Sequence, residues 1–285
     1  MYRIRIFSSF CDSNHCKSVY ERLCEVDKMD NYGPTKSIYI VNDDEPYTHA
    51  ILINTAMPLL QIPLINVVGF AFEPPQILFA IHSNEFNKYL NYVNKNVNKY
   101  YIGSNKGLIY QFIESYSYMW HTTPPKIIPY KNNLCSIMIS QKMNAPGHIY
   151  THELVKKILH KNYPIDIYGR GCIYYNNDAR IKDEFIETEP YEEYMFHICI
   201  ENYKTSSYTS EKYTNALLWG ATPIYWGAIN PIFPSFTIEL TGNISKDMDI
   251  IKDIVINPMK FKKYFSHEEI RDKINLLKNL DTIFS

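Results

Sequence analysis

The sequence predicts an α/β protein with two Rossmann-like halves, and three features support this fold class. Apolar runs of strand length alternate with helical patterns along the chain. A segment rich in proline and basic residues, 122–133, interrupts that alternation near the middle. The second half contains a strand–helix–strand unit at 196–227, the pattern of a parallel sheet. With 285 residues, the chain suits two domains of roughly 100 to 150 residues each.

The first half, expected as a domain over residues 1–125, opens with a strand and continues the alternation. The acids of Asn42–Pro46 follow a predicted strand, where a D-x-D motif could hold a divalent metal. The sequence there is D-D-E before a proline, so we favour a solvated turn. Strands are predicted at Tyr2–Phe7, Ser37–Val41, His49–Ile53, Ile65–Phe72 and Tyr100–Gly103, and helices at Ser18–Val26 and Glu85–Val97.

Glu73 follows the apolar run Ile65–Phe72 and precedes Pro74 and Pro75. The two prolines stiffen the turn, so the carboxylate is well placed to project into a cleft. Burial in such a cleft would raise the pKa of the carboxyl group and suit it to accept a proton near neutral pH. The alternative is an acidic residue in a surface turn.

The second half, expected as a domain over residues 126–265, repeats the alternation, and a terminal helix is expected within 266–285. Ile250–Ile256 fits either a helix or a strand. Strands are predicted at Leu134–Ile139, Ile165–Tyr168, Phe196–Ile200 and Thr222–Trp226, and helices at His148–Leu159, Glu189–Tyr194, Ser210–Trp219 and His267–Leu280.

Polar residues gather where the strand at Phe196–Ile200 is joined to the helix that begins at Ser210. In α/β proteins nucleotides bind at this edge of the sheet, and a helix N-terminus attracts phosphate. Glu211 could accept hydrogen bonds from two ribose hydroxyls, and the Lys212 ammonium suits a diphosphate. The alternative is a helix cap at Thr209 or Ser210 with both charges in water.

The string that begins at Glu201 resembles the donor-binding motif of the family 10 glycosyltransferases, the α1,3/α1,4-fucosyltransferases. That motif commonly reads F-E-N-x(5)-Y-x-T-E-K, followed by a helix of small residues and P-[IV]-[YV]-x-G. The matching residues fall in register without a gap, and Ser210 stands where threonine is usual. They are Glu201, Asn202, Tyr208, Glu211, Lys212, Pro223, Ile224, Tyr225, Trp226 and Gly227.

The resemblance implies the two-domain GT-B architecture, in which two Rossmann-like domains face a central cleft. It further implies inverting transfer from a GDP-sugar, most often GDP-fucose, to a hydroxyl of an acceptor glycan, without a metal or other cofactor. Glu73 matches the place of the family's general base. Lys212, with Asn202 and Tyr208, would stabilise the diphosphate, and Glu211 would hold the ribose.

At one further position the sequence departs from the family pattern, and at another the role of the residue stays open. Family members usually carry an arginine for the donor phosphates near the helix at 148–159, and here His148, or Lys142 earlier in the loop, occupies that place. Neutral imidazole is a weaker phosphate partner than guanidinium. Arg170 lies in a Y-G-R-G string that resembles the family's strand end, and its side chain either faces the cleft or packs on the next loop.

Composition argues against several classes of protein. The formal net charge of -1 argues against a nucleic-acid-binding footprint spread over the whole surface, though not against a local basic cleft. No apolar run reaches the length of a membrane span, and the first residues alternate as in a strand rather than a signal peptide. The cysteines include no CxxC pair, and Cys11, His15 and Cys16 lack zinc-site spacing. We therefore expect a soluble cytoplasmic protein of bacterial or viral type with reduced thiols and no bound metal.

Two alternatives to a fucosyltransferase follow from the same residues. The substitution of the expected arginine and the short N-terminal half favour an enzyme of this fold that uses another nucleotide sugar. A non-catalytic protein that binds a glycan or nucleotide could retain the donor motif, although an intact Glu73 argues against it.

Overall fold

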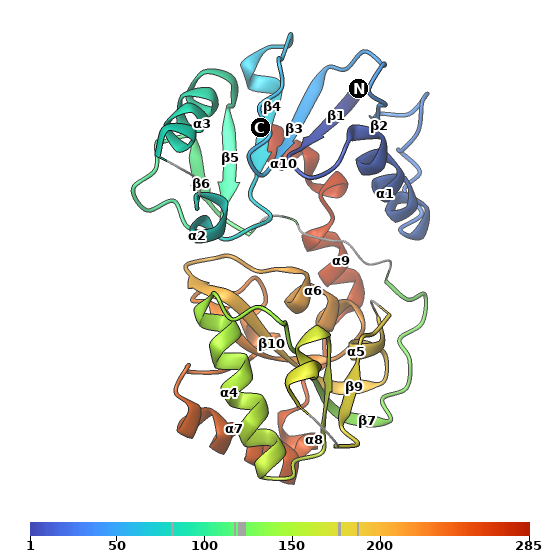
Figure 1. Cartoon of the computed structure of the whole chain (residues 1–285). Helices are drawn as coiled ribbons and strands as arrows, with labels where there is room; N and C mark the ends of the chain where they lie inside the picture. The colour runs from blue at the N-terminus through green and yellow to red at the C-terminus, as the bar shows by residue number, and fades with distance from the viewer. Residues whose placement is uncertain (81–82, 117, 119–123, 176–177, 187) are drawn as a thin grey trace. The chain divides into compact units, whose positions relative to one another are not determined.

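The computed structural model describes residues 1–80, 83–116, 118, 124–175, 178–186 and 188–285 (Figure 1). The first two residues of the expected linker at 122–133 lie outside this set. The chain forms two compact units. Unit 1 comprises Met1–Thr123, Thr205–Tyr208 and Ile274–Ser285, and unit 2 comprises Pro124–Lys204 and Thr209–Lys273. Unit 1 is therefore completed by two segments from much later in the sequence.

Unit 1 contains a parallel sheet with the strand order β2-β1-β3-β4-β5-β6. This is the flavodoxin-like order, in which the direction of strand addition reverses between β1 and β3. Consecutive residues of β2 and β4 are buried because both faces of these strands are covered. The elements are β1 (Tyr2–Ser8), α1 (Ser13–Val26), β2 (Ile38–Ile40), β3 (His49–Ile53), η1 (Leu64–Asn66), β4 (Val67–Phe70), α2 (Pro75–Leu78), α3 (Ser83–Asn96), β5 (Lys99–Ile102) and β6 (Phe112–Glu114).

Unit 2 contains a second parallel sheet with the order β12-β11-β10-β7-β8-β9. Counted from β7, this is the 3-2-1-4-5-6 order of the Rossmann fold, with its switch point between β7 and β10. The elements are β7 (Asn133–Met138), α4 (Pro146–His160), β8 (Ile165–Tyr168), η2 (Arg170–Tyr174), β9 (Ile181–Asp183), α5 (Glu189–Glu192), β10 (Tyr194–Thr205), α6 (Glu211–Leu218), β11 (Thr222–Ala228), η3 (Pro234–Phe236), β12 (Ile238–Glu239), α7 (Ile244–Ile256), α8 (Pro258–Phe261) and α9 (His267–Ile274). The predicted α/β class is confirmed.

The core of unit 2 lies between its sheet and the helices α4 and α7, which contact each other (Figure 1). A buried carboxylate joins these helices. Asp247 of α7 accepts hydrogen bonds from the Thr241 backbone N–H at 2.7 Å and hydroxyl at 2.8 Å, and from the Gly242 N–H at 2.8 Å. The Tyr150 hydroxyl of α4 donates to it at 2.6 Å. Asp247 therefore ties the start of α7 to α4.

Three predicted elements differ in the structure. The strand expected at Ile65–Phe72 is shorter, since Leu64–Asn66 forms the 3-10 turn η1 and β4 spans only Val67–Phe70. The strand expected to end at Ile200 is β10, which continues to Thr205, so Glu201 and Asn202 lie within the strand. Glu201 is buried within the strand, and one of its carboxylate oxygens accepts hydrogen bonds from the Ser210 N–H and the Tyr225 hydroxyl. The single terminal helix expected at 267–280 is also wrong, because α9 ends at Ile274.

Asn275 explains the break in the terminal helix. Its side-chain oxygen accepts the N–H groups of Leu277 and Lys278, as a helix cap does, and so starts a new turn. The chain then continues in unit 1 as η4 (Leu277–Asn279) and α10 (Leu280–Phe284).

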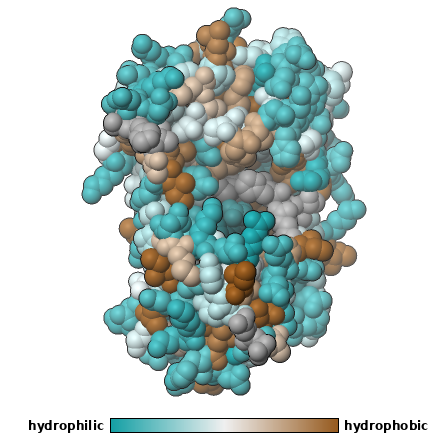
Figure 2. All heavy atoms as spheres, in the orientation of Figure 1, coloured by the Kyte–Doolittle hydropathy of each residue, from teal (hydrophilic) through white to brown (hydrophobic). Residues whose placement is uncertain are grey.

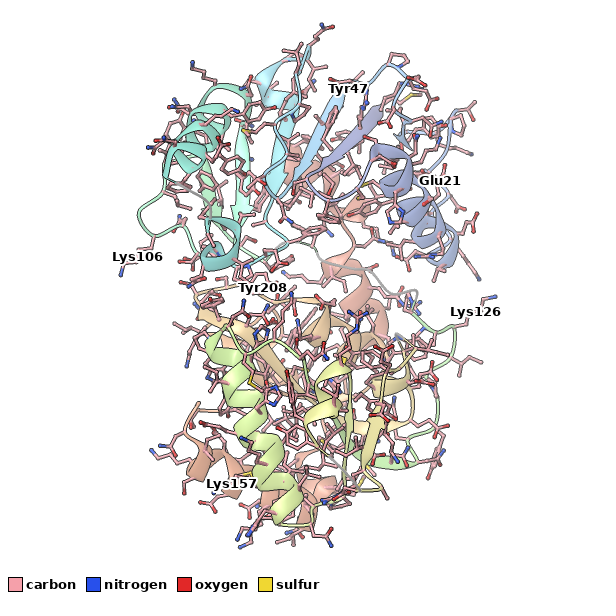
Figure 3. All side chains as sticks on the ribbon, in the orientation of Figure 1. Glu21, Tyr47, Lys106, Lys126, Lys157 and Tyr208 are labelled. Carbon is pink, nitrogen blue, oxygen red and sulfur yellow. The ribbon has the colours of Figure 1, made fainter. Side chains whose placement is uncertain are left out.

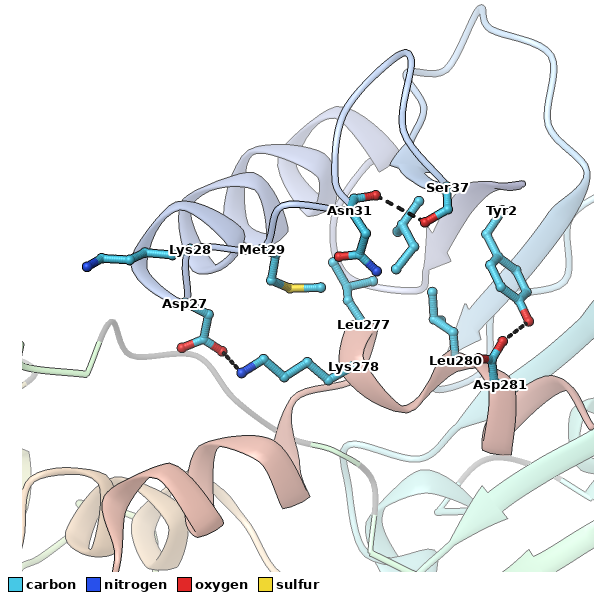
Figure 4. A pocket seen from close by; sticks show the side chains of 11 residues that line it. Tyr2, Asp27, Lys28, Met29, Asn31, Ser37, Leu277, Lys278, Leu280 and Asp281 are labelled. Carbon is cyan, nitrogen blue, oxygen red and sulfur yellow. Dashed lines mark hydrogen bonds and ion pairs between the residues drawn. The ribbon is translucent and has the colours of Figure 1, made fainter.

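This C-terminal segment is held against the first elements of unit 1 by polar contacts (Figure 4). Lys278 Nζ lies 3.6 Å from the Asp27 carboxylate, to which the Asn275 amide also donates at 2.6 Å. The Tyr2 hydroxyl donates to Asp281 at 2.6 Å. The contacts surround an open cavity of about 460 Å³. Residues at the two ends of the sequence thus build one unit.

Among the described residues, no helix is both long enough and apolar enough to cross a bilayer. On the face shown in Figure 2, hydrophobic residues form separate patches among hydrophilic ones.

We predict that Asp247→Asn lowers the free energy of unfolding by about 2 kcal/mol or more, because the amide leaves buried donors without an acceptor. Urea denaturation of wild type and variant measures the difference. Asp249→Asn, an exposed change on the same helix, is the matched control and is expected to change stability by less than about 0.5 kcal/mol. Equal effects of the two changes would contradict this account of the carboxylate.

Candidate functional site

A cavity of about 370 Å³ lies in unit 2 at the switch point of the sheet. It is formed by the carboxyl ends of β7 and β8, by β10, and by the first turns of α4 and α6, where α/β folds bind ligands. Five of the seven predicted donor-binding residues line it, together with Lys142. The lining residues are Met138, Ile139, Ser140, Lys142, His148, Thr151, Gly169, Arg170, Phe185, Ile200, Asn202, Glu211 and Lys212.

The start of α6 combines the two interpretations that the sequence left open. Ser210 is the N-cap and is fully buried, and its hydroxyl accepts the N–H of Lys212 at 3.3 Å. The charged groups of Glu211 and Lys212 lie 3.3 Å apart and remain partly exposed in the cavity. Ser210 therefore affects the cavity only by capping α6. The side chains of Glu211 and Lys212 line the cavity and can contact a ligand directly.

Glu201 holds the segment that leads into α6, a contribution that the sequence did not reveal. Its side chain is 1% exposed, and one carboxylate oxygen accepts the Ser210 N–H at 2.7 Å and the Tyr225 hydroxyl at 3.4 Å. Burial raises the pKa of this carboxyl group, against the opposing effect of the Lys212 charge. A Cβ at Gly227 would lie 2.3 Å from the Glu201 Cγ, so the glycine makes room for the carboxylate.

The first turn of α4 places His148 at the cavity. A Cβ at Gly147 would lie 1.8 Å from the Glu201 carbonyl oxygen, so only glycine allows the helix to start this close to β10. His148 is partly buried, and its Nδ1 lies 3.1 Å from the Asn144 side-chain oxygen. Desolvation, followed by the charges of Lys212 and Lys142, lowers the pKa of His148. The imidazole is therefore neutral at pH 7 in the absence of an anion.

Arg170 lines the cavity from its solvent side. It follows Gly169, which has φ +107°, and its guanidinium lies 3.3 Å from the Glu184 carboxylate. Both side chains are 77% exposed, and such surface ion pairs contribute little energy. The guanidinium can therefore exchange Glu184 for a ligand at small cost.

Tyr208 is placed differently from the other predicted donor-binding residues. It is on the segment between β10 and α6 that belongs to unit 1, and it is 4% exposed (Figure 3). Its hydroxyl donates to the carbonyl oxygen of Phe72 at 3.2 Å. A Cβ at Gly103 would lie 2.3 Å from the Tyr208 Cβ, so this glycine permits the close contact. The structure thus places Tyr208 beside the peptide that precedes Glu73, rather than in the lining of the cavity.

Glu73 lies in unit 1, partly buried, between β4 and the proline that precedes α2. Both backbone polar groups of the preceding residue, Phe72, are hydrogen-bonded, because Asn54 accepts the Phe72 N–H at 2.8 Å and Tyr208 donates to its carbonyl. Asn54 has φ +55°, and its own carbonyl accepts the hydroxyls of Tyr89 and Tyr100 at 3.0 and 2.7 Å. Sequence reasoning missed Asn54, although an asparagine directly after a predicted strand could have indicated this backbone conformation.

The described part of the chain contains no evident metal-binding site. Among the described residues, no three His, Cys, Asp or Glu side chains are grouped so that they could hold an ion. The acids of the turn at 42–46 instead form ion pairs: Asp43 lies 2.9 Å from Arg5, and Glu45 lies 3.8 Å from Lys17.

Comparisons with known proteins extend these observations. "Putative fucosyltransferase R654" of Acanthamoeba polyphaga mimivirus is 28% identical over 181 residues, which are 54% of this chain and 28% of that protein. The chain thus spans less than a third of the length of this curated relative. A crystal structure of an alpha1,3-fucosyltransferase with GDP shares the fold, with a TM-score of 0.51 over 99% of this chain and 92% of its own, at 14% identity.

The family assignment depends on the second half of the chain. The family model described as "Glycosyltransferase family 10 (fucosyltransferase) C-term" matches residues 128–275, which include every residue that lines the cavity. This match covers more than half of the 285 residues. The chain therefore belongs to glycosyltransferase family 10, the fucosyltransferases.

Proposed function

We propose that the chain is an inverting glycosyltransferase that moves L-fucose from GDP-fucose to a hydroxyl group of an acceptor glycan. The observation that carries the proposal is the cavity of unit 2, which combines a carboxylate, basic side chains and the N-terminus of α6 at the switch point of a Rossmann-like sheet. The related fold of an alpha1,3-fucosyltransferase solved with GDP supports the choice of nucleotide.

In the proposed donor site, oppositely charged side chains contact different parts of the nucleotide sugar. Lys212 neutralises the diphosphate beside the N–H groups of α6, and Asn202 donates a hydrogen bond to it. Glu211 accepts hydrogen bonds from the ribose hydroxyls. His148, Lys142 and Arg170 border the same cavity, and His148 or Lys142 takes the place of the arginine that family members usually carry.

Ser210 and Tyr208 contribute to this proposal indirectly. Ser210 orders the first turn of α6, and its N–H is held by Glu201. Tyr208 holds the carbonyl of Phe72, next to Glu73. We therefore treat both as positioning residues.

In the proposed reaction, unit 1 contributes the general base and recognises the acceptor, and unit 2 binds the donor. The Glu73 carboxylate accepts the proton of the acceptor hydroxyl as its oxygen attacks the anomeric carbon. The bond from that carbon to the diphosphate breaks, and the departing oxygen keeps the electron pair. Attack opposite the leaving group inverts the anomeric configuration.

The proposed reaction uses no metal, because Lys212 and the N-terminal N–H groups of α6 can balance the charge of the leaving diphosphate. We also propose that the protein acts in a reducing compartment such as the cytoplasm. Its six cysteines are free thiols, and five of them are buried.

The identity of the nucleotide is tested first. We expect GDP to raise the melting temperature of the purified protein by several degrees, and UDP, CDP and dTDP to raise it less, because only a ligand that binds the native state stabilises it. EDTA should leave the GDP effect unchanged. Transfer of fucose from GDP-fucose to a panel of glycan acceptors then tests turnover. A preference for another nucleotide would favour an enzyme of the same fold that uses a different nucleotide sugar. This is the main competing proposal, because His148 stands where family members usually carry an arginine.

The roles of the two main residues are tested by single substitutions. Lys212→Ala should weaken GDP binding by about tenfold or more, because it removes a charge-assisted hydrogen bond. Glu73→Gln should leave GDP binding intact and lower kcat about 10²-fold or more, because the amide cannot accept the proton. Calorimetry and initial rates measure the two effects. Lys157→Ala, an exposed change on α4 (Figure 3), is the charge-matched control for Lys212. Normal turnover by Glu73→Gln would exclude it as the base.

The protonation of His148 should make GDP binding depend on pH. Its pKa is lowered in the free protein, and a bound diphosphate would raise it, so binding takes up a proton. GDP affinity of wild type, relative to His148→Gln, should therefore increase severalfold as the pH falls from 7.5 to 5.5. Taking the ratio at each pH cancels the protonation of GDP itself. A constant ratio would show that His148 does not contact the phosphates.

A further inference from the structure

A second cavity, of about 500 Å³, lies in unit 2 at the opposite end of the sheet from the first. Lys131 precedes β7, Met195 is the second residue of β10, and Gly220 precedes β11, so the cavity borders the amino ends of three strands. The residues that line it are Ile128, Pro129, Tyr130, Lys131, Met195, Gly220, Met259, Lys262, Lys263, Tyr264, Phe265 and His267. As far as the structure describes the chain, this lining includes three lysines and a histidine but no acidic residue.

Lys131 is held at this cavity by three backbone carbonyl groups. Its ammonium group donates to the carbonyl oxygens of Tyr191 at 3.1 Å and Glu192 at 2.7 Å, and also to that of Trp219. Desolvation, followed by the charge of Lys262, lowers the pKa of Lys131 to about 8, although nearby glutamates oppose the shift. Lys131 and Lys262 line the same cavity and repel each other electrostatically, so an anion bound there would offset this repulsion.

The other basic groups of the cavity have no acidic partner among the described residues. Within the described residues, neither Lys262 nor Lys263 nor His267 forms an ion pair with a carboxylate. The backbone N–H of Lys263 donates to the Thr222 hydroxyl at 3.0 Å, which anchors this lysine to the start of β11. The Nε2 atom of His267 is buried and has no hydrogen-bond partner in the described structure.

Apolar and aromatic side chains surround these charges. Tyr130, Tyr264 and Met259 are 83%, 73% and 62% exposed, so a ligand could cover large ring and thioether surfaces. The Lys262 ammonium lies 5.5 Å from the centre of the Tyr264 ring. A purely inorganic anion would leave this surface uncovered, whereas a phosphate attached to a ring or acyl chain would use both parts of the cavity.

We propose that this cavity is a second binding site, for a phosphorylated ligand whose ring or acyl chain packs on Tyr130, Tyr264 and Met259 while its phosphate contacts Lys262, Lys263 and His267. The site is independent of the donor cavity, because the two lie at opposite ends of the same parallel strands. The same phosphate chemistry could come from a soluble metabolite or from a lipid headgroup, and the experiment separates these sources.

Methionine methyl groups provide a readout for each cavity. Met195 and Met259 line the second cavity, and Met138 lines the donor cavity. In protein labelled with [¹³C-methyl]methionine, phenyl phosphate should produce saturable shifts of Met195 and Met259. The double variant Lys262→Ala/Lys263→Ala should weaken that binding fivefold or more. The double variant Lys156→Ala/Lys157→Ala, which removes two exposed lysines of α4, is the charge-matched control and should bind normally. Thermal unfolding confirms that both variants are folded.

A second arm of the experiment identifies the source of the phosphate. Cosedimentation with phosphatidylglycerol vesicles, weaker with phosphatidylcholine vesicles and lost in Lys262→Ala/Lys263→Ala, would assign the site to a lipid headgroup. Saturable methyl shifts with phenyl phosphate and no vesicle binding would assign it to a soluble phosphorylated ligand. The proposal is overturned if neither probe binds, if only Met138 responds, or if both double variants bind as the wild type does.

Discussion

The cavity that we propose as the donor site depends on the buried hydrogen bond between the Glu201 carboxylate and the Ser210 N–H. Burying a carboxylate is costly unless its oxygens are satisfied, and this bond, with that from Tyr225, helps to offset the cost. In return, the bond fixes where α6 begins. The N-cap, the N–H groups of the first turn and the side chain of Lys212 all take their positions from that point. Gly147 and Gly227 are then required because larger residues would meet Glu201.

A different constraint acts on unit 1, where the turn that carries Glu73 is ordered by its own neighbours. Asn54 and Tyr208 hold the N–H and carbonyl groups of Phe72, so both polar groups of the preceding residue are satisfied. Tyr208 reaches this position because the chain leaves unit 2 after β10 and re-enters it before α6. The donor motif therefore contains residues that belong to separate units and serve separate purposes.

Parallel strands also explain why unit 2 can carry two different cavities. All carboxyl ends lie at one edge of the sheet and all amino ends at the other, so each edge collects its own loops. The carboxyl edge combines Glu211 with basic groups, as a nucleotide with ribose and phosphate requires. The lining of the amino edge contains basic and aromatic residues without an acid, which suits an anion that carries an apolar group.

Local patterns in the sequence were sufficient for the fold class, for most strands and helices, and for five residues that line the donor cavity, because period and motif spacing are local properties. The structure alone decided that Glu201 continues a strand, that Asn275 divides the terminal helix, and that Tyr208 packs in unit 1. The outcomes for Glu201 and Tyr208 depend on hydrogen-bond partners or packing from other parts of the sequence, and Asn275 adds a distant bond to Asp27 to its local bonds with Leu277 and Lys278. The sequence identifies the motif residues, but only the folded structure shows which distant residues contact each other.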